Sequence, residues 1–173
     1  MRSRHLVLVG LMGAGKTSVG EECAHRLGRP FVDTDALVVA AAGVPFDELW
    51  SAEGEAGFRA REAVAVADAS AAPEPVVIAT GGGAVLDPVN RRTLRERGVV
   101  VWLDASPGVL RERVVSPASR PLLAGEPEVA LARLARLRAP AYEAAAHARV
   151  DTEGRTVGQV ADTVLEEYDA WSA

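Results

Sequence analysis

The chain of 173 residues is 49% hydrophobic and 25% charged, an ordinary mixture for one globular domain that spans residues 1–173. Its formal net charge of −5 argues against a nucleic acid or an anionic membrane surface as the main partner. With no N-terminal leader, no long apolar span and Cys23 as its only cysteine, the chain is expected to be cytoplasmic, without membrane contact or an internal disulfide.

An apolar run followed by a glycine-rich loop opens the chain. Residues 6–9 are typical of a strand, residues 10–17 read Gly-Leu-Met-Gly-Ala-Gly-Lys-Thr, and a helical pattern follows to residue 27. The loop matches G-x-x-x-x-G-K-[ST], in which backbone amides surround phosphate oxygens, the lysine neutralises the β- and γ-phosphates, and the hydroxyl binds Mg²⁺. Lys16 is the only lysine beside 18 arginines, which favours a specific role for its compact ammonium group. The predicted phosphate-binding residues are Gly13, Ala14, Gly15, Lys16, Thr17 and Ser18.

Strands and helices are predicted to alternate along the whole chain. The predicted strands are 6–9, 31–33, 76–79, 99–103 and 148–151. The predicted helices are 17–27, about 35–42, 46–50, 55–71, 88–97, 107–115, 128–146 and 157–171, with a surface loop at 116–127. This alternation predicts an α/β fold in which helices cover both faces of a parallel sheet, and such sheets bind ligands at the carboxyl ends of their strands.

A phosphate loop is compatible with three classes of protein: a small-molecule kinase, a GTPase-type switch, and a motor or assembly ATPase. A guanine-specific switch would need an Asn-Lys-x-Asp motif, which a single lysine at position 16 excludes. An ATPase would need an apolar strand ending in an acid, which residues 99–104 offer, but Ala105 stands where a water-activating glutamate is expected. The dinucleotide fingerprint G-x-G-x-x-G fails as well, because Ser18 replaces its third glycine. A kinase explains the most residues.

Six motifs in order make the sequence resemble the shikimate kinase family along nearly its whole length. They are Gly10-Leu-Met-Gly-Ala-Gly-Lys-Thr17, Asp33-Thr-Asp35, Gly57-Phe-Arg-Ala-Arg-Glu62, Ala79-Thr-Gly-Gly-Gly-Ala-Val-Leu86 with Asn90-Arg91, Arg120-Pro-Leu-Leu123, and Arg138 shortly before Tyr142. The resemblance implies a three-layer α/β/α fold with a central five-stranded parallel sheet, of the P-loop, nucleoside-monophosphate-kinase type. It also implies transfer of the γ-phosphate of ATP to the 3-hydroxyl of shikimate, in the route to chorismate and the aromatic amino acids. The alternatives are another small-molecule P-loop kinase, such as a gluconate kinase, and a non-kinase NTPase.

The resemblance also assigns the metal and catalytic residues. Thr17 would bind Mg²⁺ directly and Asp33 would hold the ion through water, which suits an ion that keeps several waters. Asp35 would accept hydrogen bonds from the ring hydroxyls of shikimate and could take the proton of the attacking hydroxyl, although positioning does most of the work in phosphoryl transfer. A helix N-cap is the structural alternative for Asp35. The catalytic residues would be Lys16, Asp35 and Arg120.

Arginines and glycines would form the shikimate site. Arg59 and Arg138 would clamp the carboxylate, because a guanidinium fork matches a carboxylate with two hydrogen bonds, and Glu62 would fix the rotamer of Arg59 from the same helix face. This pair with the triple glycine favours a cyclic carboxylate carrying ring hydroxyls. The glycines would let the backbone approach the ring, or would serve a turn with positive φ. They are Gly81, Gly82 and Gly83, with Gly82 expected to donate its N–H.

A lid is implied at about residues 114–127, and a substrate-binding region at about residues 34–62. Arg120 would arrive with the lid, stabilise the charge of the transition state and help to exclude water.

Two family positions, Arg113 and Arg155, would lie near the adenine, although residues 152–156 lack the proline that some members carry. In the family an Ile-Glu pair often follows the acidic end of the second strand, and this chain has Val-Val-Ala at residues 38–40 instead. We therefore expect the substrate-side helix to pack differently from that of other members. ATP and shikimate are the expected small-molecule partners, and the protein is expected to be a monomer.

Overall fold

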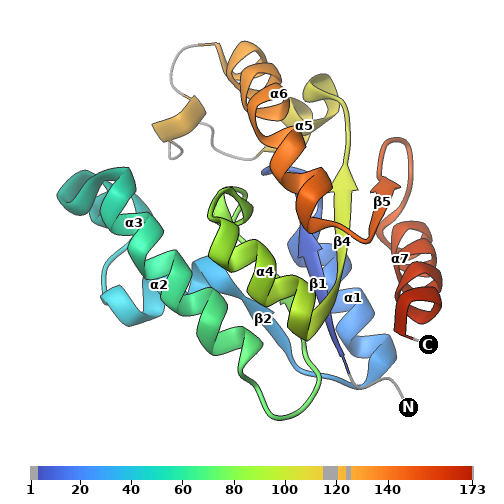
Figure 1. Cartoon of the computed structure of the whole chain (residues 1–173). Helices are drawn as coiled ribbons and strands as arrows, with labels where there is room; N and C mark the ends of the chain where they lie inside the picture. Colours follow the sequence, from blue (N-terminus) through green and yellow to red (C-terminus); the bar gives the residue numbers. More distant parts are fainter. Residues whose placement is uncertain (1–3, 115–120, 124–125, 173) are drawn as a thin grey trace.

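The computed structural model of the chain, which describes residues 4–114, 121–123 and 126–172, has a five-stranded parallel sheet at its centre (Figure 1). The strand order is β2-β3-β1-β4-β5, so the strand that precedes the glycine-rich loop is the middle one. The strands are β1 (His5–Val9), β2 (Phe31–Asp33), β3 (Val77–Ala79), β4 (Gly98–Asp104) and β5 (Ala148–Asp151). The predicted α/β fold is confirmed, and each predicted strand end lies within one residue of the observed end.

Helices cover both faces of the sheet and give the three layers that the family resemblance implies. Helix α1 packs beside α7, whereas α4 packs beside α3 and α6. Figure 1 shows α4 and α6 in front of the strands and α1 behind them. The helices are α1 (Lys16–Leu27), α2 (Thr34–Ala42), α3 (Phe46–Ser70), α4 (Pro88–Arg97), α5 (Pro107–Arg113), α6 (Pro127–Ala145) and α7 (Val157–Ser172). Two short 3₁₀ segments, η1 (Ala84–Leu86) and η3 (Pro121–Leu123), lie where the sequence predicts only loop. Within the described ranges, none of the helices is long and apolar enough to cross a membrane.

The strands β1 and β3 are buried along their whole length, and β4 is buried up to its last residue. They show no alternation of apolar and polar residues because helices cover both faces of a parallel sheet. Strand pairing places Val9 opposite Trp102, and Asp33 opposite Ala79. The segments that follow β1, β2 and β3 therefore begin at the same edge of the sheet, where ligands bind in this type of fold.

Helix α3 contains a kink at Gly54, where φ is 67° and ψ is −174°. Essentially only glycine adopts this combination without strain. The sequence predicts two separate helices at 46–50 and 55–71, and the structure joins them across this one residue. The predicted interruption is confirmed, but it is a kink rather than a linker.

A small hydrophobic cluster joins α2 to α3 beside the main core. Its buried members are Val38, Leu49, Phe58 and Ala65. The rings of Phe46, Trp50 and Phe58 meet there with centroid distances of 5.0 to 5.6 Å. Val38, in the segment that departs from the family pattern, thus contributes to the contact between α2 and the helix that carries Arg59.

Two histidines hold backbone amides beside the sheet. Nδ1 of His5 accepts the N–H of Val76 at 3.1 Å, so its proton is on Nε2, which donates to the carbonyl of Ser70 at 3.2 Å. Nδ1 of His147 accepts the N–H of Val100 at 2.9 Å. Burial lowers the pKa of His5, and burial together with nearby arginines lowers the pKa of His147 to about 4. Both rings are therefore neutral acceptors in the folded protein near pH 7.

These lowered pKa values predict that the fold loses stability in mild acid. Between about pH 6.5, the value expected in the unfolded chain, and pH 4 the unfolded chain binds more protons than the folded one. The free energy of unfolding therefore falls as pH falls, by up to about 3 kcal/mol for His147, since one pKa unit corresponds to about 1.4 kcal/mol. The check is the melting temperature from pH 7.5 to 4.5 for the wild type and for His147→Asn, which keeps an acceptor without titrating. We expect a shallower decline in the variant and an unchanged slope in His25→Asn, an exposed control. Equal slopes in all three proteins would contradict the assignment.

Candidate active site

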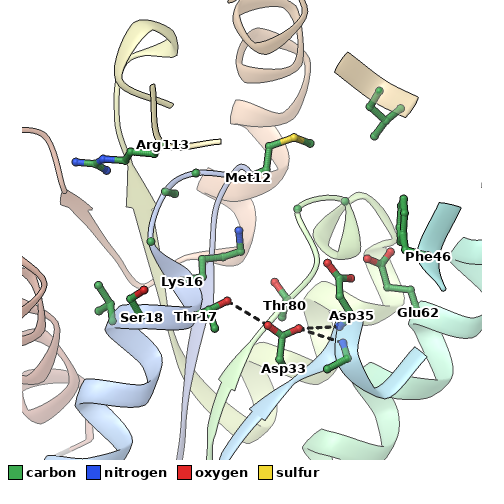
Figure 2. A pocket seen from close by; sticks show the side chains of 18 of the residues that line it. Met12, Lys16, Thr17, Ser18, Asp33, Asp35, Phe46, Glu62, Thr80 and Arg113 are labelled. Atoms are coloured by element: carbon green, nitrogen blue, oxygen red, sulfur yellow. Dashed lines mark hydrogen bonds between the residues drawn. The ribbon is translucent and has the colours of Figure 1, made fainter. Parts of the chain in front are cut away.

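A cleft of about 810 Å³ lies where the segments after β1, β2 and β3 begin (Figure 2). This volume is typical of a site for a small molecule. The cleft brings together most of the predicted site residues: Gly13, Ala14, Gly15, Lys16, Thr17, Ser18, Asp33, Asp35, Arg59, Gly82, Gly83, Arg113, Arg138 and Arg155. Gly81 is not among the residues that line the cleft, and Arg120 lies outside the described residues.

The phosphate loop is held in a shape that requires its glycines. Gly10, Gly13 and Gly15 have φ values of 146°, 81° and 94°. A Cβ atom on Gly10 would overlap the carbonyl of Leu103, and one on Gly13 would lie 2.7 Å from the carbonyl of Leu110. The loop thus packs closely against β4 and α5, and α1 begins at its end, so that the amides of the first helical turn face the cleft.

Lys16 crosses the phosphate loop from the first position of α1. Its Nζ atom donates a hydrogen bond to the carbonyl of Leu11 at 2.9 Å. Figure 2 shows the side chain extending into the space enclosed by the loop. An ammonium group has three donors, so this bond fixes the side chain and is compatible with further bonds to phosphate oxygens.

Asp33, the last residue of β2, connects two helices at the centre of the site. Its Oδ2 accepts a hydrogen bond from Oγ1 of Thr17 at 3.2 Å, and its Oδ1 accepts the backbone amides of Asp35 and Ala36 at 2.9 and 3.3 Å (Figure 2). Asp33 is therefore the N-cap of α2. The alternative that Asp35 serves as the N-cap is wrong, because Asp35 is already the second residue of the helix.

The carboxylates of Asp35 and Glu62 converge on Gly81. A Cβ atom there would overlap Oδ1 of Asp35 and Oε1 of Glu62, and Figure 2 shows the two carboxylates close together. Glu62 is 1% exposed, and its Oε2 accepts a hydrogen bond from Arg59 at 2.7 Å. Burial raises the pKa of Glu62, the nearby Arg59 opposes this, and the Asp35 carboxylate raises it further. The predicted pairing of Glu62 with Arg59 is confirmed.

The triple glycine is explained by space and not by backbone conformation. The alternative of a turn with positive φ is wrong, since positive φ occurs at other glycines: 10, 13, 15, 28, 43, 54 and 154. A Cβ atom on Gly83 would overlap the guanidinium group of Arg59, and one on Gly82 would lie 3.3 Å from Nη1 of Arg138. Arg138 is 3% exposed, whereas the side chain of Arg59 is partly open to the cleft. Both arginines thus meet the same loop.

Two residues hold this loop by hydrogen bonds that the sequence does not predict. Oγ1 of the buried Thr34 accepts the N–H of Gly81 at 3.0 Å, so this amide is already used within the protein. The hydroxyl of Tyr142 donates to the carbonyl of Gly82 at 2.6 Å. The available signals are weak: Thr34 stands between the two aspartates of a motif, and Tyr142 follows Arg138 by four residues on one helix face.

At the other end of the cleft, two arginines are tied to the segment that joins β5 to α7. Arg113 donates to Oγ1 and to the carbonyl of Thr152, both at 2.8 Å. Arg155 donates to the carbonyl of Asp151 at 3.0 Å and to residues of the following helix. The apolar Val157 lines the cleft beside them. This end therefore combines planar cations with an apolar wall.

The acid at the end of β4 does not belong to the phosphate site. Asp104 pairs with Arg149, which lies over the ring of Trp102 at 4.5 Å. These three residues line a second cavity, on which Leu11 and Tyr142 also border. The ATPase interpretation needs an acid beside the phosphate loop, and Asp104 does not line that cleft.

The middle strand of the sheet ends in the phosphate loop, and Arg59, Arg138 and two carboxylates lie in the part of the cleft beside Gly81 to Gly83. This is the arrangement of P-loop kinases that phosphorylate small molecules. The family model for shikimate kinase matches residues 12–169. The chain therefore belongs to the shikimate kinase family.

Individual relatives agree with this assignment. The shikimate kinase of Symbiobacterium thermophilum is 52% identical over 165 residues, which cover 94% of each chain. The shikimate kinase of Dechloromonas aromatica is 45% identical over 167 residues, 96% of this chain and 91% of the relative. The solved structure of the Acinetobacter baumannii shikimate kinase in complex with shikimate matches with a TM-score of 0.91 at 37% identity, over 95% and 92% of the two chains. A gluconokinase from Sinorhizobium meliloti matches with a TM-score of 0.63 at 23% identity and shares the fold alone.

The crowding at Gly81 predicts that Gly81→Ala damages the site. The added Cβ would displace the carboxylates of Asp35 and Glu62, and a displacement of about 1 Å can cost about a hundredfold in kcat/KM. The matched control is Gly108→Ala in α5, where a Cβ meets no atom within 4 Å, and we expect wild-type kinetics from it. Steady-state kinetics and melting curves of both variants are the measurement. Wild-type kcat/KM in Gly81→Ala would contradict the observed packing.

Proposed function

We propose that this chain is a shikimate kinase, which transfers the γ-phosphate of ATP to the 3-hydroxyl of shikimate and gives shikimate 3-phosphate and ADP. The observation that carries the proposal is the acceptor half of the cleft. Arg59 and Arg138 approach one glycine loop there, beside the carboxylate of Asp35. A cyclic carboxylate with ring hydroxyls needs cations at one end and acceptors for its hydroxyls at the other.

The nucleotide half of the site is assigned to the phosphate loop. The amides of residues 13–18 would surround the phosphates, and Lys16 would neutralise the β- and γ-phosphate charge. Arg113 and Arg155 would face the adenine, which an apolar and planar surface suits well. Because both arginines are bound to backbone carbonyls of the β5–α7 segment, their planes are held before the nucleotide arrives.

The donor set beside the phosphate loop fits Mg²⁺. Oγ1 of Thr17 and Oδ2 of Asp33 lie 3.2 Å apart, and the other oxygen of Asp33 is used in capping α2. One hydroxyl and one carboxylate are enough for an ion that keeps several waters and binds phosphate oxygens. The chemistry that Mg²⁺ would supply when bound is neutralisation of the charge that develops on the phosphates during transfer. Thr17 would contact the ion directly, and Asp33 would hold it through water.

On the acceptor side, Asp35 would orient the ring hydroxyls and receive the proton of the attacking one. We rank orientation first, because positioning and charge neutralisation do most of the work in phosphoryl transfer. Arg59 and Arg138 would bind the carboxylate, and the amide of Gly82 would donate to the substrate. The amide of Gly81 is held by Thr34, so Gly81 would contribute by close approach alone.

The family resemblance supports further proposals about the organisation of the chain. Arg120 would be carried by a lid at about residues 114–127 and would stabilise transition-state charge. The chain would consist of a core, a substrate-binding region at about residues 34–62 and this lid. The protein would be monomeric and cytoplasmic, with neither a membrane nor a nucleic acid as a partner.

A coupled assay of ADP release under Mg²⁺-ATP tests the proposed function. We expect turnover with shikimate and little with gluconate or nucleoside monophosphates, because only shikimate presents a ring carboxylate to the arginine pair. Detection of shikimate 3-phosphate by mass spectrometry identifies the product. Turnover with gluconate and none with shikimate would overturn the assignment in favour of the alternative kinase.

Replacing Arg59 tests the carboxylate clamp. In Arg59→Ala we expect the KM for shikimate to rise about 10- to 100-fold, the range for losing charge-assisted hydrogen bonds, and the KM for ATP to change less than about twofold. Arg61→Ala is the matched control, because Arg61 lies two residues away, pairs with Glu53 and does not line the cleft. Its kinetics should equal those of the wild type. Equal effects of Arg59→Ala on both KM values would remove Arg59 from the clamp.

A further inference from the structure

Tyr142 is a buried residue of α6 that does not line the active-site cleft. Its hydroxyl donates to the carbonyl of Gly82 at 2.6 Å, and its ring stacks on Trp102 with a centroid distance of 5.4 Å and an interplanar angle of 27°. It also borders the second cavity. The stacking fixes the ring, so the position of the hydroxyl is fixed as well.

This hydrogen bond sets the direction of a peptide group that faces the cleft. In a trans peptide the C=O and the N–H point in opposite directions. Because the carbonyl of Gly82 points back to Tyr142, the N–H of Gly83 points away from it. The preceding peptide is held in the same manner, since the carbonyl of Gly81 accepts the N–H of Ala84 at 3.1 Å. The amides of Gly82 and Gly83 are thereby directed away from the groups that hold their carbonyls.

Arg138 is part of the same packed group. It lies one helical turn before Tyr142, so the two side chains share a face of α6. A Cβ atom on Gly82 would lie 3.3 Å from Nη1 of Arg138 and 3.7 Å from the hydroxyl of Tyr142. Both side chains are nearly inaccessible to solvent, at 3% and 1% exposure. A shift of the glycine loop would therefore move against both of them.

We propose that Tyr142 is a positioning residue for the acceptor substrate: its hydroxyl holds the Gly82–Gly83 peptide against Arg138, so that backbone amides and guanidinium face the shikimate in one arrangement. The proposal rests on the proposed function and adds to it a residue that never touches the substrate. Burial raises the pKa of Tyr142 to about 12, against the opposing effect of Arg138, so the hydroxyl remains a donor at every usual assay pH. Its contribution to substrate binding should therefore be constant across that pH range.

The chain offers a matched pair of substitutions, since it has two tyrosines. Tyr168, on α7, is also buried, and its hydroxyl also donates to a backbone carbonyl at 2.6 Å, that of Arg4. Tyr142→Phe and Tyr168→Phe each remove one such bond and keep the ring, and Tyr168→Phe also removes the hydrogen bond that Arg29 donates to the hydroxyl at 2.8 Å. We expect Tyr142→Phe to raise the KM for shikimate about three- to tenfold, from pH 6.5 to 8.5, with kcat and the KM for ATP changed less than about twofold. Tyr168→Phe should lower the melting temperature and leave both KM values unchanged.

A double variant tests whether the effect passes through the packed group. In an Arg138→Ala background, Tyr142→Phe should raise the KM for shikimate by less than it does in the wild type, because its partner is already lost. The proposal is overturned if Tyr142→Phe changes only the melting temperature, if it raises both KM values equally, or if its effect is undiminished in the Arg138→Ala background. A wild-type protein that does not phosphorylate shikimate would overturn the proposed function itself, which is a separate outcome.

Discussion

Three successive residues without side chains, Gly81 to Gly83, let groups from three helices meet at one loop. The carboxylates of α2 and α3 reach Gly81, the buried guanidinium of α6 reaches Gly82, and the guanidinium of Arg59 reaches Gly83. None of the three glycines has a positive φ, so the constraint is one of volume. Because protein interiors are close-packed, a methyl group at Gly81 or Gly83 would have to displace a charged side chain, and one at Gly82 would make a tight contact with the guanidinium of Arg138.

The end of β2 links the two halves of the site. Asp33, Thr34 and Asp35 are consecutive, and together they contact both halves. Asp33 accepts a hydrogen bond from Thr17 beside the phosphate loop. Thr34 accepts the N–H of Gly81, and the carboxylate of Asp35 lies against the same glycine. Their placement follows from the pairing of Asp33 with Ala79, which sets β2 in register with the strand that leads into the glycines. In the proposed function, phosphate donor and acceptor would share one rigid edge of the sheet, and a reaction that depends mainly on positioning gains from such an edge.

The order of the elements and the composition of the site could be predicted from the sequence, because strand patterns and motif spacings are local properties. Side-chain directions could not. Asp104 ends a strand as an ATPase acid would, yet it pairs with Arg149 beside a different cavity. From the sequence, the triple glycine is equally compatible with a tight turn. Only the side chains packed against it show that glycine is needed there for lack of space. The hydrogen bond from Tyr142 to Gly82 joins residues that are 60 positions apart in the sequence, so no local sequence pattern predicts it.

The electrostatics of the acceptor site follow from the same crowding. The whole chain is negative, so the positive charge for an acidic substrate must come from a few held cations. Glu62 is buried against Arg59 and offsets part of the cost of removing that guanidinium from water before any substrate binds. A guanidinium has five donors, so the pair leaves donors for a carboxylate that enters the cleft. Because the arginine is already partly buried and held by Glu62 and Glu55, its attraction for such a carboxylate would not be spent on ordering the side chain.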